Sequence, residues 1–389
     1  MNKKIFGSLF FSIFAATTGV GIVLPLLPVY GRNLGASGLY IGFIFGVFSL
    51  SRTFFLPYFG SLSDKKGRKL FIVAGLFLYS LLSLAFMFSN NIDQLLFIRF
   101  IQGIASAMII PVAQAYIGEI TPNGKEGLSM GLFNMSIFLG LSVGPLIGGL
   151  IKDRFGFQIS FACMGFLAFI GFLLSFFLLP PTNSEHLVWR RAKPITWSRL
   201  LKDNAIAGLF MFRFAYTICI GVIWGFLPVF ADSEFSISSS TIGTLLALGV
   251  LINGLMNTPM GFLSDRVNKK LMIISGGLIA AYAVFSFARA TDLLDLFVSH
   301  IIFGFGGGIS MPPLMALAVL KGNKSDAMGS VMALMTMAHS LGMLLGAILA
   351  GLAMDIFHLR KVFPLGAILM VIGVGVFYIC TYDQKRKVK

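Results

Sequence analysis

The sequence predicts an all-α integral membrane protein in which twelve transmembrane helices form two pseudo-symmetric six-helix bundles. The first observation is composition: the 389-residue chain is 57% hydrophobic and 12% charged, whereas a soluble domain carries about 25% charged residues. The second is a polar ten-residue loop at 60–69 that recurs 201 residues later at 261–270. A repeat at half the chain length indicates a duplicated unit.

Twelve apolar segments each reach the roughly 20 residues that a helix needs to cross a bilayer. We expect helices near 5–30, 38–60, 70–90, 94–117, 127–151, 160–181, 204–231, 238–260, 270–290, 294–320, 328–354 and 362–381. The segment at 5–30 is too long for the apolar region of a signal peptide, so we expect it to be the first membrane helix.

The charged residues behind the net charge of +15 are unevenly distributed between the two sides of the predicted membrane protein. The termini and the loops after even-numbered helices hold 21 Lys/Arg and 8 Asp/Glu, whereas the opposite loops hold 6 and 7. A Lys/Arg excess marks the cytoplasmic side, so we expect a multi-pass plasma (bacterial inner) membrane protein with both termini in the cytoplasm. Because the positive charge is distributed by membrane side, nucleic acid is excluded as a partner, and the lipid bilayer is the expected surroundings.

The duplication extends along the whole chain. Equivalent residues recur at offsets of 200–202, namely Pro28 and Pro228, Ile41 and Ile242, Gly42 and Gly243, and Asp153 and Asp355. An even number of helices per unit gives both halves the same orientation, with a binding cavity between them near the bilayer midplane. We expect bundles at 1–181 and 204–389, joined by a cytoplasmic linker at 182–203.

The repeated loop carries the first motif, with Gly60, Asp64, Gly67 and Arg68 in one copy and Gly261, Asp265 and Lys269 in the other. Gly60 is expected to permit a close helix crossing. Asp64 is spaced to pair with Arg68 if the turn is helical. The second copy replaces the Gly-Arg pair with Asn268-Lys269.

Two further motifs lie in the predicted helices one and five. Helix five contains Gly140, Gly144, Pro145, Gly148 and Gly149. The spacing i, i+4, i+8 places three of these glycines on one helix face, where a neighbouring helix can approach closely. Helix one combines Gly19 with Pro25 and Pro28, which is typical of a proline-kinked helix.

The fourth motif is Arg99 followed by Gln102 and Gly103 in the fourth helix. A buried arginine is costly in a membrane, so it is expected to face a cavity or a partner, unless it snorkels to the nearby helix end.

Together the four motifs resemble those of the major facilitator superfamily, and within it the twelve-helix drug–proton antiporters. The repeated loop is similar to motif A, Arg99 and its neighbours to motif B, the glycines of helix five to the exporters' motif C, and the prolines of helix one to the exporters' proline pattern. The resemblance implies alternating access and outward transport, a latch at motif A that is weaker in the second copy, and a link between Arg99 and proton handling.

One departure from the antiporter pattern concerns the proton. Proton-coupled exporters usually carry a carboxylate inside a helix, yet all fifteen acidic residues here map to loops or helix ends. The candidates for proton coupling are therefore Arg99, Gln102, Glu119, His300 and His339. A histidine suits this role because its unperturbed pKa is about 6.5, and His339, near the middle of the eleventh predicted helix, is the better candidate. A hydrogen-bonded packing histidine is the equal alternative.

Polar and aromatic residues at membrane depth are the candidates for substrate contact: Arg52, Arg213, Tyr216, Trp224, Asn253, Asn257, Gln114 and Asn134. Interhelical hydrogen bonding explains the amides equally well. Arg52 and Arg213 favour a carboxylate or phosphate over a cation.

These observations predict a secondary transporter that exports small amphiphilic or lipophilic compounds by alternating access, coupled to proton antiport. The alternatives are a transporter of organic or lipid-like anions driven by exchange or by the substrate gradient, and a non-transporting membrane sensor. The chain has no nucleotide-binding P-loop. We expect a monomer that is not an enzyme and has no catalytic residue, metal or cofactor.

Overall fold

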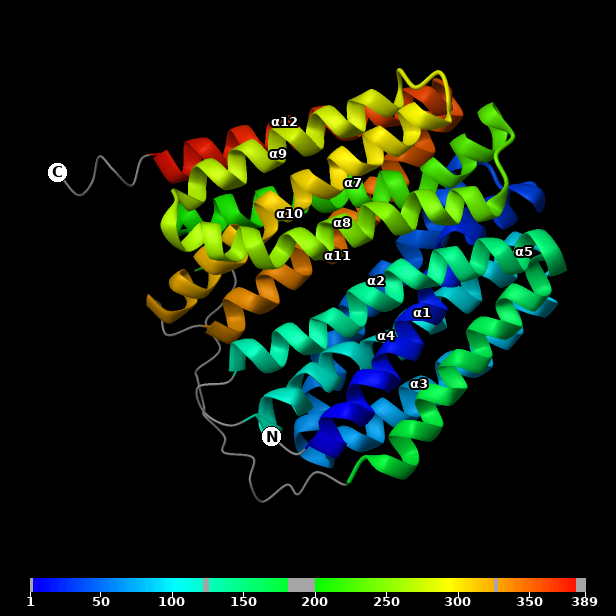
Figure 1. Ribbon diagram of the computed structural model, residues 1–389, viewed down its shortest axis with the longest axis horizontal. Coiled ribbons are helices and arrows are strands. Elements are labelled where there is room, and N and C mark those ends of the chain that lie inside the picture. Colours follow the sequence, from blue (N-terminus) through cyan, green and yellow to red (C-terminus); the bar gives the residue numbers. More distant parts are fainter. Residues whose placement is uncertain (1–2, 122–125, 181–199, 325–327, 383–389) are drawn as a thin grey trace. The chain divides into compact units, whose positions relative to one another are not determined.

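The computed structural model describes residues 3–121, 126–180, 200–324 and 328–382, and these residues form helices joined by short turns (Figure 1). The α-helices are α1 (Lys3–Asn33), α2 (Gly38–Lys66), α3 (Arg68–Ala85), α4 (Ile92–Ile120), α5 (Glu126–Leu178), α7 (Asn204–Phe235), α8 (Ser239–Arg266), α9 (Lys269–Phe287), α10 (Leu293–Lys324), α11 (Met328–Ile356) and α12 (Val362–Tyr382). Eleven helices of the described chain are long and apolar enough to cross a membrane.

Helix α5 accounts for two of the twelve predicted spans. Its apolar part, Ser129–Leu178, is 50 residues long, which is far more than one crossing needs. Gly156 interrupts the helix with a φ of 85°, a backbone conformation that glycine adopts without steric strain. This break falls between the predicted spans at 127–151 and 160–181.

The chain divides into two compact units that exchange short segments. The first comprises Met1–Ala36, Val47–Trp189 and Ala231–Ala247, and the second comprises Ser37–Gly46, Arg190–Phe230 and Leu248–Lys389. The first turns of α2 and α8 therefore belong to the unit formed mainly by the other half of the sequence. The predicted bundle boundaries stay a prediction, and most of the predicted linker lies outside the described residues.

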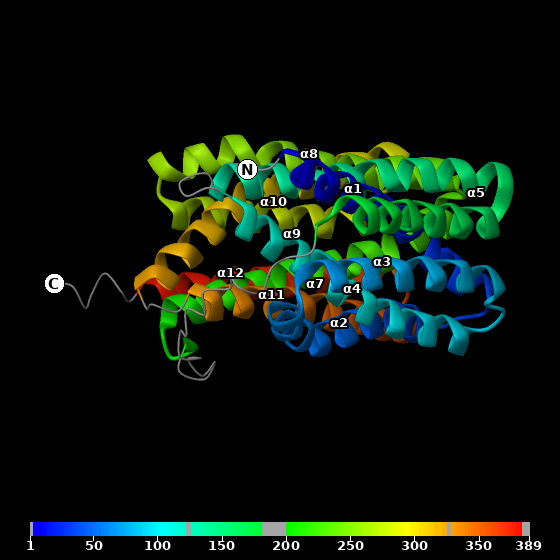
Figure 2. The same ribbon diagram turned by 90° about the horizontal axis from the view of Figure 1, so that it is seen from below.

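In the first unit, α1 packs along α5, and α3 packs against α4 and α5; α1 and α5 run side by side in Figures 1 and 2. Fully buried rings of Phe86, Phe133 and Phe161 fill this interior. In the second unit, α9 packs between α10 and α12, around the buried rings of Phe287 and Phe363.

Candidate functional site

The glycine face of α5 lies directly against α1. A Cβ atom built at Gly144 would come within 2.6 Å of the Gly21 Cα atom, and one at Gly148 within 2.8 Å of the Ile22 Cα atom. Thr17 strengthens the crossing by donating a hydrogen bond to the Ser136 carbonyl at 3.4 Å. The close approach that the glycine spacing predicts is therefore present, and any side chain at Gly144 would push the helices apart.

The second unit repeats this crossing between α7 and α11. A Cβ atom at Gly346 would come within 2.8 Å of the Ile218 Cα atom, and Thr217 donates to the Ala338 carbonyl at 3.2 Å. Ala347 stands at the position equivalent to Pro145. The glycine contact is thus common to both halves, whereas the proline is particular to α5.

A carboxylate caps the first turn of α8. The two oxygens of Asp153 accept the backbone N–H groups of Ser239 at 3.1 Å and of Ser240 at 2.7 Å. The first N–H groups of a helix have no partner within the helix, and the helix dipole favours a negative charge there. Gly149 permits the approach, since a Cβ atom there would lie 2.7 Å from Ser240 Cα.

Asp355 makes the equivalent cap on α2. Its oxygens accept the N–H groups of Gly38 at 2.7 Å and of Leu39 at 2.9 Å. The sequence pattern paired Asp153 with Asp355, but their role as caps was missed. The available signal was a repeated aspartate at the end of an otherwise apolar helix.

The first copy of the repeated loop holds a charged cluster around Arg68. Arg68 forms an ion pair with Asp64, donates to the Ser63 hydroxyl at 2.6 Å and binds Glu119 at 2.8 Å. Gly67 has a φ of 91°, which favours glycine at this turn. The structure therefore brings the proton-relay candidate Glu119 to the motif A loop.

The second copy has a simpler ion pair. Lys269 lies 3.6 Å from Asp265, whose side chain is 77% exposed, and donates to the Ser264 carbonyl at 2.6 Å. Among the described residues, nothing outside the glycine's own helix backbone and chain neighbours lies within 4 Å of a Cβ atom built at Gly60 or Gly261, and the close crossing at Gly60 stays a prediction. Both glycines lie near the end of a helix, beyond its tightly packed part.

Arg99 and Gln102 form a buried polar cluster with α2. Arg99 donates to the Gln102 side-chain oxygen at 2.8 Å, and its guanidinium lies 4.3 Å from the centre of the Phe48 ring. Gly103 is in contact with the α2 backbone, since a Cβ atom there would lie 3.2 Å from the backbone nitrogen of Arg52. The helix crossing therefore brings Arg52 beside the motif B residues.

The equivalent position in the second unit holds His300. Its imidazole occupies the space left by Gly249, where a Cβ atom would collide with the ring. The ring lies 6.2 Å from that of Phe303 and 6.1 Å from that of Phe287. His300 is only 3% exposed, so it is a buried titratable group in an aromatic environment.

Tyr216 links α7, α8 and α10 in the second unit. Its hydroxyl accepts a hydrogen bond from Asn253 at 3.2 Å, and its ring stacks on Phe303 with centres 5.4 Å apart. Asn257 donates to Asn253. Arg213 contacts the Met311 sulfur at 2.7 Å, while its Nε atom has no hydrogen-bond partner among the described residues.

The other predicted site residues are spread over several helices. Trp224 on α7, His339 on α11 and Gln114 on α4 are half-buried, and Asn134 on α5 is exposed. Both Pro25 and Pro28 lie within the continuous helix α1. Among the described residues, no three His, Cys, Asp or Glu side chains are grouped to hold a metal ion.

An ion pair lies at the start of α7. Lys321 contacts the Asp203 carboxylate at 2.9 Å, and Asp203 also accepts the Ala205 N–H at 2.8 Å. Burial raises the pKa of Asp203, but the hydrogen bonds from Lys321 and Ala205 outweigh it, and the net pKa lies below its usual value.

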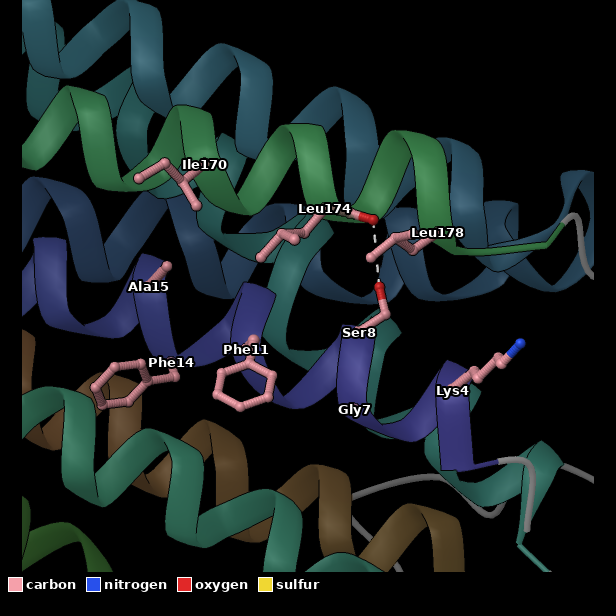
Figure 3. Close-up of a pocket in the computed structure, with 9 residues that line it drawn as sticks. All are labelled: Lys4, Gly7, Ser8, Phe11, Phe14, Ala15, Ile170, Leu174 and Leu178. Atoms are coloured by element: carbon pink, nitrogen blue, oxygen red, sulfur yellow. Dashed lines mark hydrogen bonds between the residues drawn. The ribbon is translucent and has the colours of Figure 1, made fainter.

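A groove of about 440 Å³ runs between α1 and the C-terminal part of α5 (Figure 3). Phe11, Leu174 and Leu178 contribute to its apolar walls, and Lys4 lies at one end. Ser8 bridges the helices by donating to the Leu174 carbonyl at 3.2 Å. None of the predicted site residues lines this groove.

Comparison with known proteins decides the family. The model of the Major Facilitator Superfamily matches residues 9–232 and 209–389. The chain belongs to this superfamily. It is therefore a multi-pass membrane transport protein with the superfamily's twelve-helix fold, and the family predicted from the motifs is confirmed.

Relatives within the superfamily match almost the whole chain. An uncharacterized MFS-type transporter of Methanocaldococcus jannaschii is 31% identical over 376 residues, covering 96% of both chains. Multidrug resistance protein 2 of Bacillus subtilis is 26% identical over 386 residues, covering 96% of this chain and 94% of that one. A bacterial homolog of the human lysosomal transporter Spinster has the same fold, with a TM-score of 0.84, 13% identity and coverage of 97% and 96%.

Proposed function

We propose that this superfamily member exports small amphiphilic or lipophilic compounds across the bacterial inner membrane by alternating access, coupled to proton antiport. The observation that carries the export proposal is the packing of the motif C face: Gly144 and Gly148 of α5 lie against the α1 backbone. The similarity to a multidrug resistance protein over nearly the full chain supports the same direction of transport.

In the proposed cycle, residues 1–181 rock against 204–389 around a midplane cavity, and the chain works as a monomer with cytoplasmic termini. Arg68 and its partners, together with the weaker Lys269–Asp265 pair, stabilise one conformation on the cytoplasmic side. The caps made by Asp153 and Asp355 stabilise the packing of the helix ends on the other side of the membrane, at the starts of α8 and α2.

The proton carrier proposed first is His300. It is buried in an aromatic environment, and histidine is the side chain whose unperturbed pKa of about 6.5 suits proton exchange near physiological pH. His339 is the second candidate. Glu119 is the weaker carboxylate candidate because it is already bound to Arg68.

Everted membrane vesicles test the proposal. The neutral dye N-phenyl-1-naphthylamine would be followed as it accumulates in vesicles with an acidic lumen, with and without the K⁺/H⁺ exchanger nigericin. We expect accumulation that nigericin abolishes. We expect His300→Gln to reduce it to passive equilibration, which nigericin does not change. Accumulation that ignores the gradient in the native protein would contradict proton coupling, and no accumulation above vesicles lacking the protein would contradict export.

A further inference from the structure

The cluster around Arg52 presents hydrogen-bond donors without a matching acceptor. Arg52 Nε and Gln102 Nε2 are inaccessible to solvent, and neither has a hydrogen-bond partner among the described residues. Gln102 is fully buried. A buried donor without an acceptor is unfavourable, so two of them on the crossing helices α2 and α4 point to a missing acceptor.

The orientation of Gln102 is determined by its neighbour. Because Arg99 can only donate, the Gln102 atom that it contacts at 2.8 Å must be the oxygen. The amide nitrogen then points away as a donor. The Tyr79 hydroxyl lies within electrostatic range of both Arg52 and Arg99, and it adds a third kind of donor. Among the described residues, no carboxylate lies within ion-pairing distance of Arg52.

The second half of the chain shows that the Arg52 and Gln102 donors are not needed for the two helices to pack. Gly304, equivalent to Gly103, crosses α8 in the same way, since a Cβ atom built there would lie 2.6 Å from the Gly249 carbonyl oxygen. At that crossing Asn253 replaces Arg52, and Phe303 replaces Gln102. The same helix contact therefore forms without either donor, so the donors of the first unit require another explanation.

We propose that Arg52, Tyr79, Arg99 and Gln102 form a binding site for an oxyanion carried by the transported molecule, in the first instance the carboxylate of an aromatic amphiphile. Guanidinium groups bind carboxylates through paired, charge-assisted hydrogen bonds, and the Gln102 amide supplies an additional one. The anion would provide the negative charge that the helices lack. This inference rests on the proposed transport function and names its substrate class.

Binding to the purified full-length protein in lipid nanodiscs tests this site. The probes share one ring system and differ in charge: 1-naphthylacetate, 2-(1-naphthyl)ethanol and 1-naphthylmethylamine. Calorimetry should show 1-naphthylacetate binding at least about tenfold more tightly than the other two, a difference that one good charge-assisted contact provides. Equal affinities, or a preference for the amine, would overturn the proposal.

Two substitutions locate the binding. Gln102→Glu places a carboxylate beside Arg52 without changing side-chain size, and should abolish the preference for 1-naphthylacetate. Gln94→Glu makes the same change at an exposed position in the first turn of α4 and should leave the preference intact. If Gln102→Glu does not fold, Arg52→Lys provides the second test, since it keeps the charge and loses the paired geometry. A preference for 1-naphthylacetate that survives Gln102→Glu or Arg52→Lys would contradict the site.

A further measurement separates a substrate site from a general anion site. Sodium acetate at equal concentration should not displace 1-naphthylacetate, because the proposal requires the apolar ring as well as the carboxylate. Displacement by acetate would show a site for small anions only and would overturn the substrate assignment. Because this measurement involves neither transport nor a pH gradient, its result is independent of the vesicle experiment that tests export.

Discussion

The carboxylate of Asp355 accepts the backbone N–H of Gly38 at 2.7 Å. The acceptor lies at the end of α11, and the donor opens α2, more than 300 residues earlier. Asp153 makes the equivalent contact with α8. Each cap joins segments from opposite halves of the sequence, so the proposed rocking motion requires both caps to open.

Weakening one cap should expose the helix start that it holds. Ser239 is only 4% exposed, so Ser239→Cys serves as a reporter after Cys163, Cys219 and Cys380 are replaced by alanine. Loss of a cap costs about 1 kcal/mol, which is a factor of about five in the open population. Asp153→Asn should therefore speed maleimide labelling of the reporter about fivefold.

Asp93→Asn is the control for this experiment, because it makes the same charge change at an exposed position in the first turn of α4. It should leave labelling unchanged. Equal labelling rates in Asp153→Asn and the native background would mean that the cap does not hold α8.

The two copies of the repeated loop should differ in how strongly they affect the transport rate. Arg68 contacts Ser63, Asp64 and Glu119, whereas Lys269 pairs with the exposed Asp265. We expect transport rates in everted vesicles to fall in the order native, Lys269→Ala, Arg68→Lys, Arg68→Ala, because lysine cannot reproduce the geometry of the guanidinium. A larger loss in Lys269→Ala than in Arg68→Ala would reverse our assignment of the stronger latch.

Adding one methyl group to α5 should have opposite effects at two glycines. At Gly144 a Cβ atom would collide with α1, whereas none of the described atoms lies within 4 Å of one at Gly131. Gly144→Ala should destabilise the protein by about 1–3 kcal/mol. Gly131→Ala should be neutral or stabilising by up to about 1 kcal/mol, because alanine favours the helix. Melting temperatures of the purified proteins would distinguish the two effects.

The position of His300 depends on Gly249, and this offers an independent test of proton coupling. Gly249→Ala would displace the imidazole without removing it, and we expect the pH dependence of transport to change in the same direction as in His300→Gln. Gly375→Ala is the control, since nothing lies within 4 Å of a Cβ atom there in the described structure. A pH profile of Gly249→Ala that matches the native one would indicate that His300 only packs.

The Asp203–Lys321 ion pair should make the thermal stability of the protein depend on pH in the acidic range. Since the folded-state pKa of Asp203 is lowered, its contribution is fully present above the unfolded pKa of about 3.9 and disappears as the pH falls through the lower folded pKa. The melting temperature of the native protein should therefore exceed that of Asp203→Asn at pH 6, and the difference should shrink as the pH falls below about 4. A difference that stays constant with pH would contradict an ionic contribution.

The family and the positions of the helices follow from local patterns in the chain. Apolar segments of membrane-spanning length, the offset of the repeated loop and the glycine spacing of α5 depend only on neighbouring residues or on simple counting. Hydropathy and helical periodicity act over one helix at a time. For this reason the helix positions and the superfamily were predictable, and the glycine face of α5 was expected to meet another helix before that helix was identified as α1.

Contacts between distant segments were not predictable in this way. Glu119 follows Arg68 by 51 residues, and only the packing of α4 beside the loop pairs them. The N–H donors at the starts of α2 and α8 could not be matched to Asp355 and Asp153 from the sequence, because those contacts depend on which helix ends meet in space. Gly60 resembles a packing glycine in its sequence motif, yet no described atom outside its own helix backbone and chain neighbours lies within 4 Å of a Cβ atom built there. The partners of a residue depend on which helices cross, and local composition does not encode these crossings. For this reason the donor cluster at Arg52 and Gln102 became apparent only from the structure, in which α2 crosses α4 at Gly103.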